Sequence, residues 1–259
     1  MRLKDKTVFI TGSSSGIGEA CATHFAKEGA RLLLCARRVE KVQSLAKRLQ
    51  KEYNINTHVI ELDVRDQKAI QQIYNALPEE WKNLDILVNN AGLAAGLDHF
   101  QEGDVDDWER MIDTNVKGLM YVTKAFVPQM IEKKEGHIIN IGSIAGRQVY
   151  PKGIVYCASK HAVRALTQGL RQDFHGFNIR VSSVDPGAVE TEFSQVRFKG
   201  DEERAASVYE GYEPLQADDI ADAVIYCATR PPHVNISEVL IMPTAQAAAS
   251  MTYKQKKGQ

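Results

Sequence analysis

The feature that most constrains the fold is a regular alternation between short apolar runs and longer segments with helical periodicity. Seven runs are predicted to be β-strands: residues 7–11, 31–35, 57–61, 86–89, 137–141, 179–184 and 239–242. Six helix-like segments separate them: residues 17–28, 39–53, 67–77, 105–131, 157–174 and 217–228. The runs are almost entirely apolar, as expected for parallel strands that are buried on both faces. The alternation therefore predicts an α/β fold with helices on both faces of a parallel sheet.

No internal repeat, low-complexity linker or change of composition divides residues 1–259. We therefore expect a single doubly wound domain of about seven strands. Residues 190–214 depart from the alternation, since they are polar, carry charges of both signs and follow the carboxyl end of a strand. Ligands bind at that end of open α/β sheets, so we predict a substrate lid; the alternative is a solvated surface loop. Residues 251–259 are basic and lack periodicity, so we expect a flexible tail.

The composition narrows the class of protein. Lys and Arg total 32 against 33 Asp and Glu, which leaves no overall attraction to nucleic acid or to an anionic membrane. The apolar runs are far shorter than a membrane span, and the N-terminus lacks the apolar region of a signal peptide. The 4 cysteines are widely spaced, and the histidines show no ligand spacing. We predict a cytoplasmic protein with reduced thiols and no metal, nucleic-acid or membrane partner.

A Gly/Ser turn joins the first predicted strand to the first predicted helix. Its glycines permit tight turning and let a pyrophosphate approach the backbone at the helix N-terminus, while its serines add hydroxyl donors. Glycine also occurs in ordinary turns, but this position favours a dinucleotide site. The predicted contacts are Gly12, Ser13, Ser14, Ser15, Gly16, Ile17 and Gly18.

The end of the second predicted strand indicates which dinucleotide is bound. An acidic side chain at this place usually holds the ribose hydroxyls of NAD. Here Ala36 is followed by Arg37 and Arg38, and guanidinium groups match a 2′-phosphate in charge and geometry. NADP(H) is therefore predicted over NAD(H). The alternative is that one arginine is only a solvated surface residue. That alternative does not explain why the acidic side chain typical of NAD sites is absent at this position.

Further polar motifs follow the later strands. Asn115 precedes Ser143, and Tyr156 and Lys160 lie four residues apart, on one face of a helix. Together with the Gly/Ser turn, the NNAG run at residues 89–92 and the segment at 186–191, these motifs resemble the short-chain dehydrogenase/reductase family. The resemblance spans residues 6–243 and implies hydride transfer between a nicotinamide and a carbonyl or alcohol carbon.

The resemblance also implies a role for each catalytic residue. Tyr156 gives a proton to the carbonyl oxygen or takes it in the reverse reaction, and Ser143 hydrogen-bonds the same oxygen. Lys160 holds the nicotinamide ribose, and Asn115 anchors a water that relays protons to it. The pKa of a free tyrosine is near 10, so we expect the Lys160 ammonium, helped by the positive charge of an oxidised nicotinamide, to lower that of Tyr156.

The remaining cofactor contacts implied by the resemblance come from three loops. Asp63 and Val64 would contact the adenine, and the 186–191 segment would orient the nicotinamide carboxamide. The loop at 90–92 would line the ribose side and also stabilise the sheet. These residues are Asp63, Val64, Asn90, Ala91, Gly92, Pro186, Gly187, Val189 and Thr191.

The substrate is indicated by the lid and the C-terminal segment. Residues 191–203 and 233–246 resemble a subgroup that uses NADP to oxidise small 3-hydroxy acids such as serine, allo-threonine and 3-hydroxyisobutyrate. Such substrates carry a carboxylate that needs a cation. We expect Arg147, whose loop approaches the catalytic serine, and next Arg197 of the lid; Lys152 is a third candidate. Each of these is equally explained as a solvated surface charge.

Two rival functions remain at this point. One is another enzyme of the same family, either a broad carbonyl reductase or a 3-oxoacyl reductase. The other is a non-catalytic NADP(H) sensor, which could dispense with the serine, tyrosine or lysine that this chain retains. The resemblance further implies a homotetramer, so we expect a small-molecule substrate and copies of the chain itself as partners.

Overall fold

Seven parallel strands form the central sheet of the computed structural model, in which residues 1–255 are described. They are β1 (Thr7–Thr11), β2 (Arg31–Ala36), β3 (Thr57–Glu61), β4 (Ile86–Asn89), β5 (Gly136–Ile141), β6 (Ile179–Pro186) and β7 (Glu238–Ile241). Their order across the sheet is β3-β2-β1-β4-β5-β6-β7, and every neighbouring pair is parallel. This confirms the predicted doubly wound, Rossmann-like α/β fold. The strand order reverses between β1 and β4, which is where such sheets bind ligands.

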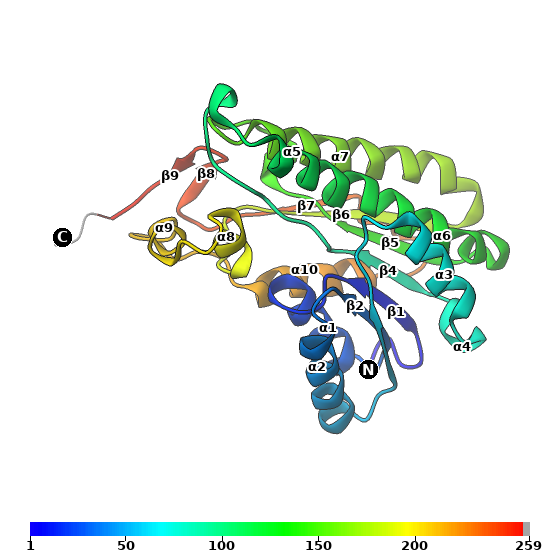
Figure 1. The fold of residues 1–259 in the computed structure, drawn as a ribbon. Helices are drawn as coiled ribbons and strands as arrows, with labels where there is room; N and C mark the ends of the chain where they lie inside the picture. The colour runs from blue at the N-terminus through cyan, green and yellow to red at the C-terminus, as the bar shows by residue number, and fades with distance from the viewer. Residues whose placement is uncertain (256–259) are drawn as a thin grey trace.

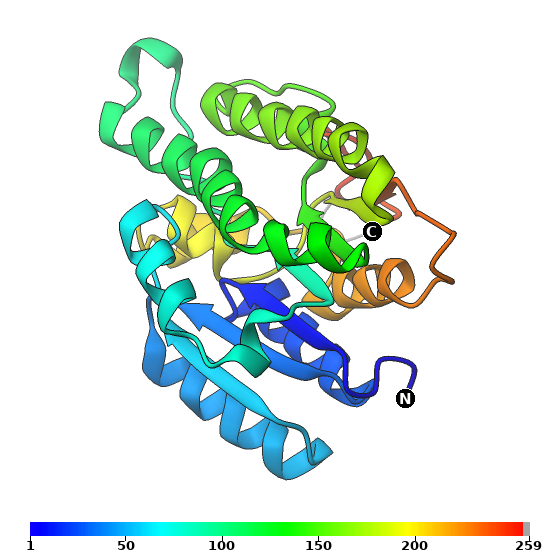
Figure 2. The same cartoon turned by 90° about the vertical axis from the view of Figure 1, so that its right-hand side faces the viewer.

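Helices cover both faces of the sheet (Figures 1 and 2). One face carries α1 (Gly16–Lys27), α2 (Val39–Tyr53) and α10 (Ala217–Ala228). The other carries α3 (Gln67–Ala76), α6 (Leu119–Lys133) and α7 (Ile154–Phe174). The shorter helical segments are α4 (Glu79–Lys82), α5 (Val105–Ile112), η1 (Phe100–Glu102), η2 (Asp113–Gly118), η3 (Ile144–Gly146) and η4 (His175–Phe177).

Side-chain alternation along the strands divides the core between the two faces. In β1, Ile10 packs with the α1 and α10 side, whereas Phe9 packs with the α6 side. In β2, Leu34 packs on the α1 and α10 side and Leu33 on the α6 side, and all four side chains are fully buried. Both faces of each central strand are therefore apolar, which explains the continuous runs in the sequence.

The structure changes three predicted boundaries that matter for the site. Strand β6 continues to Pro186 because its last residues pair with β7. Helix α7 begins at Ile154, so its first turn includes Tyr156. The single helix predicted at 105–131 consists of α5, the π-helical segment η2 and α6.

The predicted lid and tail contain short ordered elements. Residues 190–214 include α8 (Glu192–Arg197) and α9 (Glu202–Ser207). Strands β8 (Gln246–Ala248) and β9 (Met251–Thr252) pair antiparallel, and the Gln255 amide donates to the carbonyl of Gly211 at 2.7 Å. Backbone pairing thus connects residues 251–255 to residues 245–248 and to Gly211. A flexible tail at 251–259 stays a prediction, and residues 256–259 lie outside the described part. No helix within residues 1–255 has the length and apolar character needed to cross a bilayer.

Candidate active site

A cavity of about 730 Å³ lies along the carboxyl ends of the strands and beneath the predicted lid. Most residues predicted for the site line this cavity. They are Gly12, Ser14, Ser15, Gly16, Ile17, Arg37, Arg38, Asp63, Val64, Asn90, Ala91, Gly92, Ser143, Tyr156, Lys160, Pro186, Gly187, Val189, Thr191 and Arg197. Five predicted or candidate residues are not among the lining residues: Ser13, Gly18, Asn115, Arg147 and Lys152.

The Gly/Ser turn after β1 has a backbone that only glycine adopts without strain at two positions. Gly12 and Gly16 have φ of +67° and +56°. Gly18 serves packing instead, because an added Cβ would lie 2.3 Å from the carbonyl oxygen of Gly12. Ser13 is buried, and both its amide and its hydroxyl donate to the carbonyl of Cys35. Ser13 and Gly18 therefore shape the turn, and only the other five predicted contacts line the cavity. Contact of Ser13 and Gly18 with the cofactor stays a prediction.

Exposed arginines lie beside this turn at the end of β2. Arg38 Nη2 donates to the hydroxyls of Ser14 and Ser15 at 3.0 and 2.8 Å. Arg37 lines the same cavity. Asp63, which follows the end of β3, lines the cavity as well, and its carboxylate accepts hydrogen bonds from Arg65. The cavity wall near β2 thus combines hydroxyls and cations, a combination that suits phosphate.

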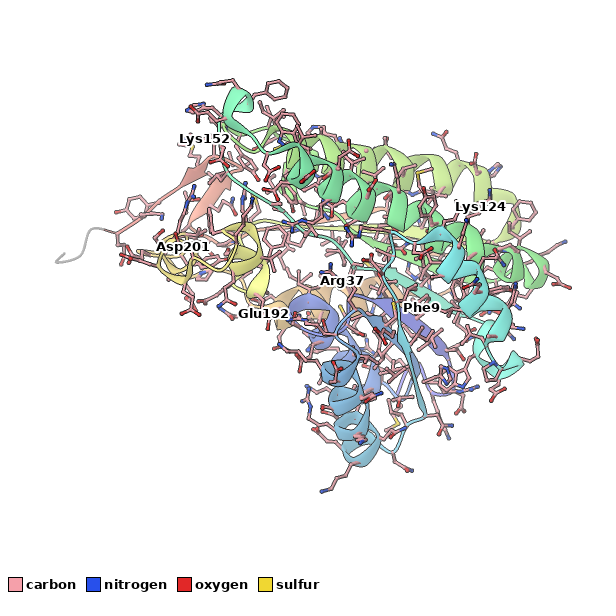
Figure 3. The ribbon with its side chains drawn as sticks, in the orientation of Figure 1. Phe9, Arg37, Lys124, Lys152, Glu192 and Asp201 are labelled. Atoms are coloured by element: carbon pink, nitrogen blue, oxygen red, sulfur yellow. The ribbon has the colours of Figure 1, made fainter. Side chains whose placement is uncertain are left out.

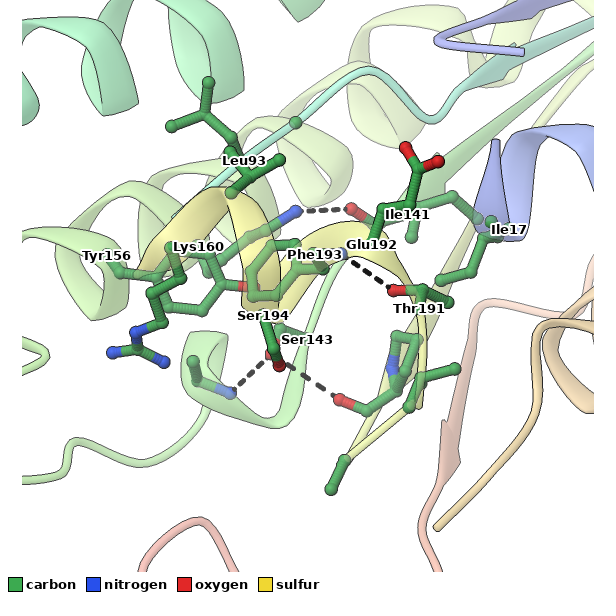
Figure 4. A pocket seen from close by; sticks show the side chains of 18 of the residues that line it. Ile17, Leu93, Ile141, Ser143, Tyr156, Lys160, Thr191, Glu192, Phe193 and Ser194 are labelled. Carbon is green, nitrogen blue, oxygen red and sulfur yellow. Dashed lines mark hydrogen bonds between the residues drawn. The ribbon is translucent and has the colours of Figure 1, made fainter. Parts of the chain in front are cut away.

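Three predicted catalytic side chains meet in one part of the cavity (Figure 4). Tyr156 and Lys160 come from α7, and Ser143 follows β5. Lys160 Nζ donates to the carbonyl of Ile141 at 2.9 Å. The Ser143 hydroxyl accepts from the amide of Ala145 at 3.0 Å and donates to the carbonyl of Pro186 at 3.5 Å. Ser143 is therefore fixed by backbone groups on two sides.

Asn115 lies behind these residues, in the π-helical segment η2. Its side-chain oxygen accepts from the amide of Leu93, and its nitrogen donates to the carbonyl of Leu93 and to Ser159, at 2.8 to 3.0 Å. A Cβ added at Gly92 would lie 3.2 Å from Asn115 Oδ1 and 3.6 Å from Lys160 Nζ, so both side chains pack close to the backbone of Gly92. Asn115 thus ties the loop after β4 to α7. The π turn that aims it inward is typical of functional sites.

Burial moves the pKa values of both Tyr156 and Lys160. It raises the pKa of Tyr156 well above its usual value, and the hydrogen bond with Ser143 opposes this only in part. Burial also lowers the pKa of Lys160 to about 8, although the carboxylate of Asp185 acts in the opposite direction. Desolvation therefore dominates the pKa of Tyr156 in the chain alone. The expected lowering, which also involves the positive charge of an oxidised nicotinamide, stays a prediction.

The profile of the short chain dehydrogenase family matches residues 6–202 of this chain. The chain belongs to the short-chain dehydrogenase family. It is 46% identical over 246 residues to the NADP-dependent 3-hydroxy acid dehydrogenase YdfG of Salmonella typhi, covering 95% of this chain and 98% of the relative. It is also 46% identical to sulfoacetaldehyde reductase 2 of Chromohalobacter salexigens over 93% of this chain and 95% of that one. Among solved structures, the closed form of serine dehydrogenase complexed with NADP⁺ aligns with a TM-score of 0.89. That structure is 43% identical and covers 96% of this chain and 100% of its own.

In this short-chain dehydrogenase, Arg147 does not face the cavity. Its Nε and Nη2 donate to the buried carboxylate of Asp185 at 2.9 and 2.7 Å, and Nη2 also binds Glu238. The prediction that Arg147 holds a substrate carboxylate is wrong, because two carboxylates of β6 and β7 already bind it. The prediction used only the short distance in sequence between Arg147 and Ser143. Asp185 and Glu238 lie far from Arg147 in the sequence, so the prediction could not take them into account.

Arg197 of α8 occupies the place that Arg147 was expected to take. Its guanidinium carbon lies 5.9 Å from the centre of the Tyr156 ring and 5.5 Å from that of Tyr150. Arg197 Nε donates to the carbonyl of Gly96 at 3.3 Å, and its buried Nη2 has no hydrogen-bond partner among the described residues. A buried, unpaired guanidinium nitrogen beside Tyr156, the predicted proton donor, is suited to bind an anionic group of a substrate.

Among the lining residues that the sequence reasoning missed are two aromatic side chains beside the predicted catalytic residues. Tyr150, from the loop before α7, lies under Arg197, and Phe193 of α8 packs edge-on against Tyr156 with ring centres 5.6 Å apart. Neither belongs to a motif with a fixed spacing, although Phe193 lies within the predicted lid. They enclose the end of the cavity that contains Tyr156.

Proposed function

We propose that this protein is an NADP-dependent dehydrogenase of small 3-hydroxy acids, such as serine and allo-threonine, and that it also reduces the corresponding 3-keto acids. One observation carries the proposal: Ser143, Tyr156, Lys160 and Arg197 line the same cavity as the Gly/Ser turn. The cavity thus joins a proton donor, an anion-binding group and a phosphate-binding turn. The names of its relatives support the same activity.

The residues of the cavity fit NADP. The turn at Gly12 and Gly16 has the backbone needed to approach a pyrophosphate, and Arg37 and Arg38 match a 2′-phosphate. The loops at 63–64, 90–92 and 186–191 would hold the adenine, ribose and carboxamide. When bound, the nicotinamide would accept a hydride from the alcohol carbon or deliver one to the carbonyl carbon.

Tyr156 then handles the proton at the substrate oxygen. Its raised pKa keeps the phenol protonated near neutral pH, which is the form that donates to a carbonyl oxygen during reduction. Oxidation needs the phenol to accept a proton, so positive charge close to it must offset the effect of burial. Lys160 supplies such a charge from the same face of α7, and Asn115 positions the loop that packs against Lys160. Ser143 would orient the substrate oxygen toward Tyr156.

Arg197 would bind the substrate carboxylate. In a 3-hydroxy acid, two carbon–carbon bonds separate the reacting carbon from the carboxylate carbon, so both groups must be held close together. Arg197 lies over the ring of Tyr156, which places a cation at that short range. Because Arg197 belongs to α8, binding of the carboxylate would also hold residues 190–214 closed as a lid.

A second candidate substrate is a small aldehyde that carries a sulfonate. A relative named as a sulfoacetaldehyde reductase is as similar as the hydroxy acid dehydrogenase cited above. Arg197 could bind sulfonate as well as carboxylate, since each group presents two anionic oxygens that can accept hydrogen bonds from one guanidinium. Broad carbonyl reduction is less favoured, because a neutral substrate would leave Arg197 Nη2 buried and unpaired.

We also propose that the protein is a cytoplasmic homotetramer, as its family resemblance implies. The exposed apolar side chains Val149 and Ile154, next to and within the start of α7, support association of this end of the helix. Light scattering at micromolar concentration should give the tetramer mass. A monomer mass would refute this part of the proposal.

The decisive experiment measures the rate of NADP⁺ reduction with L-serine, L-allo-threonine, 3-hydroxyisobutyrate, 3-hydroxybutyrate and an alcohol without a carboxylate. NADPH oxidation with sulfoacetaldehyde tests the second candidate. Turnover of the hydroxy acids that is lost in Tyr156→Phe supports the proposal. Turnover of the neutral alcohol alone would retain the family and discard the substrate class. No turnover in either direction, despite binding of NADP⁺, would favour a sensor.

A further inference from the structure

Glu192 connects the predicted lid to the cationic wall of the cavity. It is the first residue of α8, and its carboxylate lies 2.8 Å from Arg38 Nη1 and 3.0 Å from Lys41 Nζ. The hydroxyl of Thr191 caps the same helix turn by accepting from the amide of Phe193. Figure 3 labels Glu192 and, at the end of β2, Arg37. Residues that are about 150 apart in the sequence therefore form one ion-pair group.

Arg38 uses all three of its guanidinium nitrogens in this arrangement. Nη1 faces Glu192, while Nε and Nη2 donate to Ser14, and Nη2 also donates to Ser15. Arg38 thus bridges the phosphate-binding turn and the lid. By contrast, Arg37 is exposed to solvent and lines the cavity without belonging to this group.

The Glu192 carboxylate keeps its charge at any pH at which the enzyme would work. Its partial burial favours the neutral acid, but hydrogen bonds from Lys41, Arg38 and Ser15 prevail and lower its pKa to about 2. A phosphate on the ribose 2′-oxygen is also an anion, and it needs the same cations. Two anions that share one guanidinium repel each other, so each weakens the binding of the other.

We propose that Glu192 is a specificity-determining residue that competes with the 2′-phosphate of NADP for Arg38 and Lys41. This inference rests on the proposed function, since it concerns the same cofactor site. NAD carries no 2′-phosphate, so its binding leaves the Glu192 contacts in place. Glu192 therefore reduces the preference for NADP below what Arg37, Arg38 and Lys41 would give alone. Because Glu192 begins α8, binding of the 2′-phosphate would also loosen the start of the lid.

Isothermal titration of the full-length protein with NADP⁺ and NAD⁺ tests the inference without any catalytic readout. Glu192→Gln should tighten NADP⁺ binding by about three- to tenfold, the size of a partly exposed ion-pair effect, and change NAD⁺ binding by less than about twofold. A glutamine amide could itself donate to the phosphate, so Glu192→Ala must behave in the same way.

Glu190→Gln is the matched control. It removes one negative charge two residues away, where the carboxylate accepts from Gln216 and is not in the Arg38 group. It should leave both affinities within about twofold of the wild type. Unchanged or weaker NADP⁺ binding in both Glu192 variants would overturn the inference, as would equal tightening for NAD⁺ or in the control. If the wild type fails to bind NADP⁺, the proposed function fails as well.

Discussion

Arg197 lies over the ring of Tyr156, with its guanidinium carbon 5.9 Å from the ring centre. The two residues come from α8 and α7, so the contact exists only when residues 190–214 lie against the catalytic helix. The amide of Gly96 also donates to the carbonyl of Arg197 at 3.0 Å, and Lys199 pairs with Asp107 of α5 at 2.9 Å. The position of the cation over the tyrosine is thus set by the way residues 190–214 pack against residues 96–107.

The first prediction concerns this cation. Arg197→Met should lower kcat/KM for 3-hydroxy acids by roughly 30- to 100-fold, because a charged hydrogen bond to a carboxylate stabilises by about 2–3 kcal/mol. Oxidation of an alcohol without a carboxylate should fall far less. Steady-state kinetics with both substrates would measure the difference. Arg204→Met, which removes a cation that stacks on Phe198 elsewhere in the lid, is the control. Equal losses for acid and alcohol in Arg197→Met would contradict the assignment.

A second prediction separates Arg147 from substrate binding. Arg147→Met leaves the carboxylate of Asp185 buried without its strongest partner, which should lower the free energy of unfolding by about 2–4 kcal/mol. The KM for a 3-hydroxy acid should change little, because Arg147 does not line the cavity. Urea unfolding and steady-state kinetics on the same preparation test both statements. A large rise in KM with unchanged stability would restore Arg147 as the substrate cation.

The third prediction follows from the low pKa of Lys160. Burial lowers this pKa from 10.5 to about 8, so the unfolded chain binds more protons than the folded chain between about pH 8 and 10.5. Between these pH values the contribution of Lys160 to the free energy of unfolding rises with pH. Below about pH 8 the buried ammonium lowers the free energy of unfolding by roughly 3 kcal/mol. Lys160→Met should therefore be more stable than the wild type at pH 7, by less than that cost because the bond to Ile141 is lost.

Urea unfolding of both proteins at pH 7 and pH 10 measures the effect. The advantage of Lys160→Met should shrink or reverse at pH 10, while its dehydrogenase activity should be absent at both values. A stability difference that does not vary with pH would show that Lys160 keeps an ordinary pKa in the folded protein.

The sequence was sufficient for the fold and for the motifs that are local in the chain. The apolar run of β1 and the turn with Gly12 and Gly16 need only neighbouring residues, so spacing identifies them. Contacts between distant segments were not predictable in this way. Whether an arginine reaches the cavity or a buried carboxylate depends on strands that lie far away in the sequence, which is why Arg147 was misassigned. The same reason hid the pairing of Glu192 with Arg38.

The pKa of Tyr156 shows a second limit of sequence reasoning. A spacing of four residues places Lys160 on the same helical face, and this suggested a lowered pKa. The direction actually depends on how much water reaches the phenol and on where the ammonium points. In the structure Tyr156 is buried and Lys160 Nζ donates to Ile141, so desolvation prevails. Neither quantity is encoded in the spacing.

The last prediction tests the cations at the end of β2. Replacing Arg37 and Arg38 together by glutamine should weaken NADP⁺ binding by about 100-fold, since two guanidinium partners of one phosphate are lost. NAD⁺ binding should change by only a few fold, because the turn at Gly12 and Gly16 remains. The single variants should differ as well: Arg38→Gln also removes the bridge between Ser14 and Glu192, whereas Arg37→Gln removes only an exposed cation from the wall. Arg38→Gln leaves Lys41 as the cation that pairs with Glu192, so it should loosen the start of α8 and speed tryptic cleavage within residues 190–214, which Arg37→Gln should not. Equal losses for NADP⁺ and NAD⁺ in the double variant would mean that these arginines do not bind the 2′-phosphate.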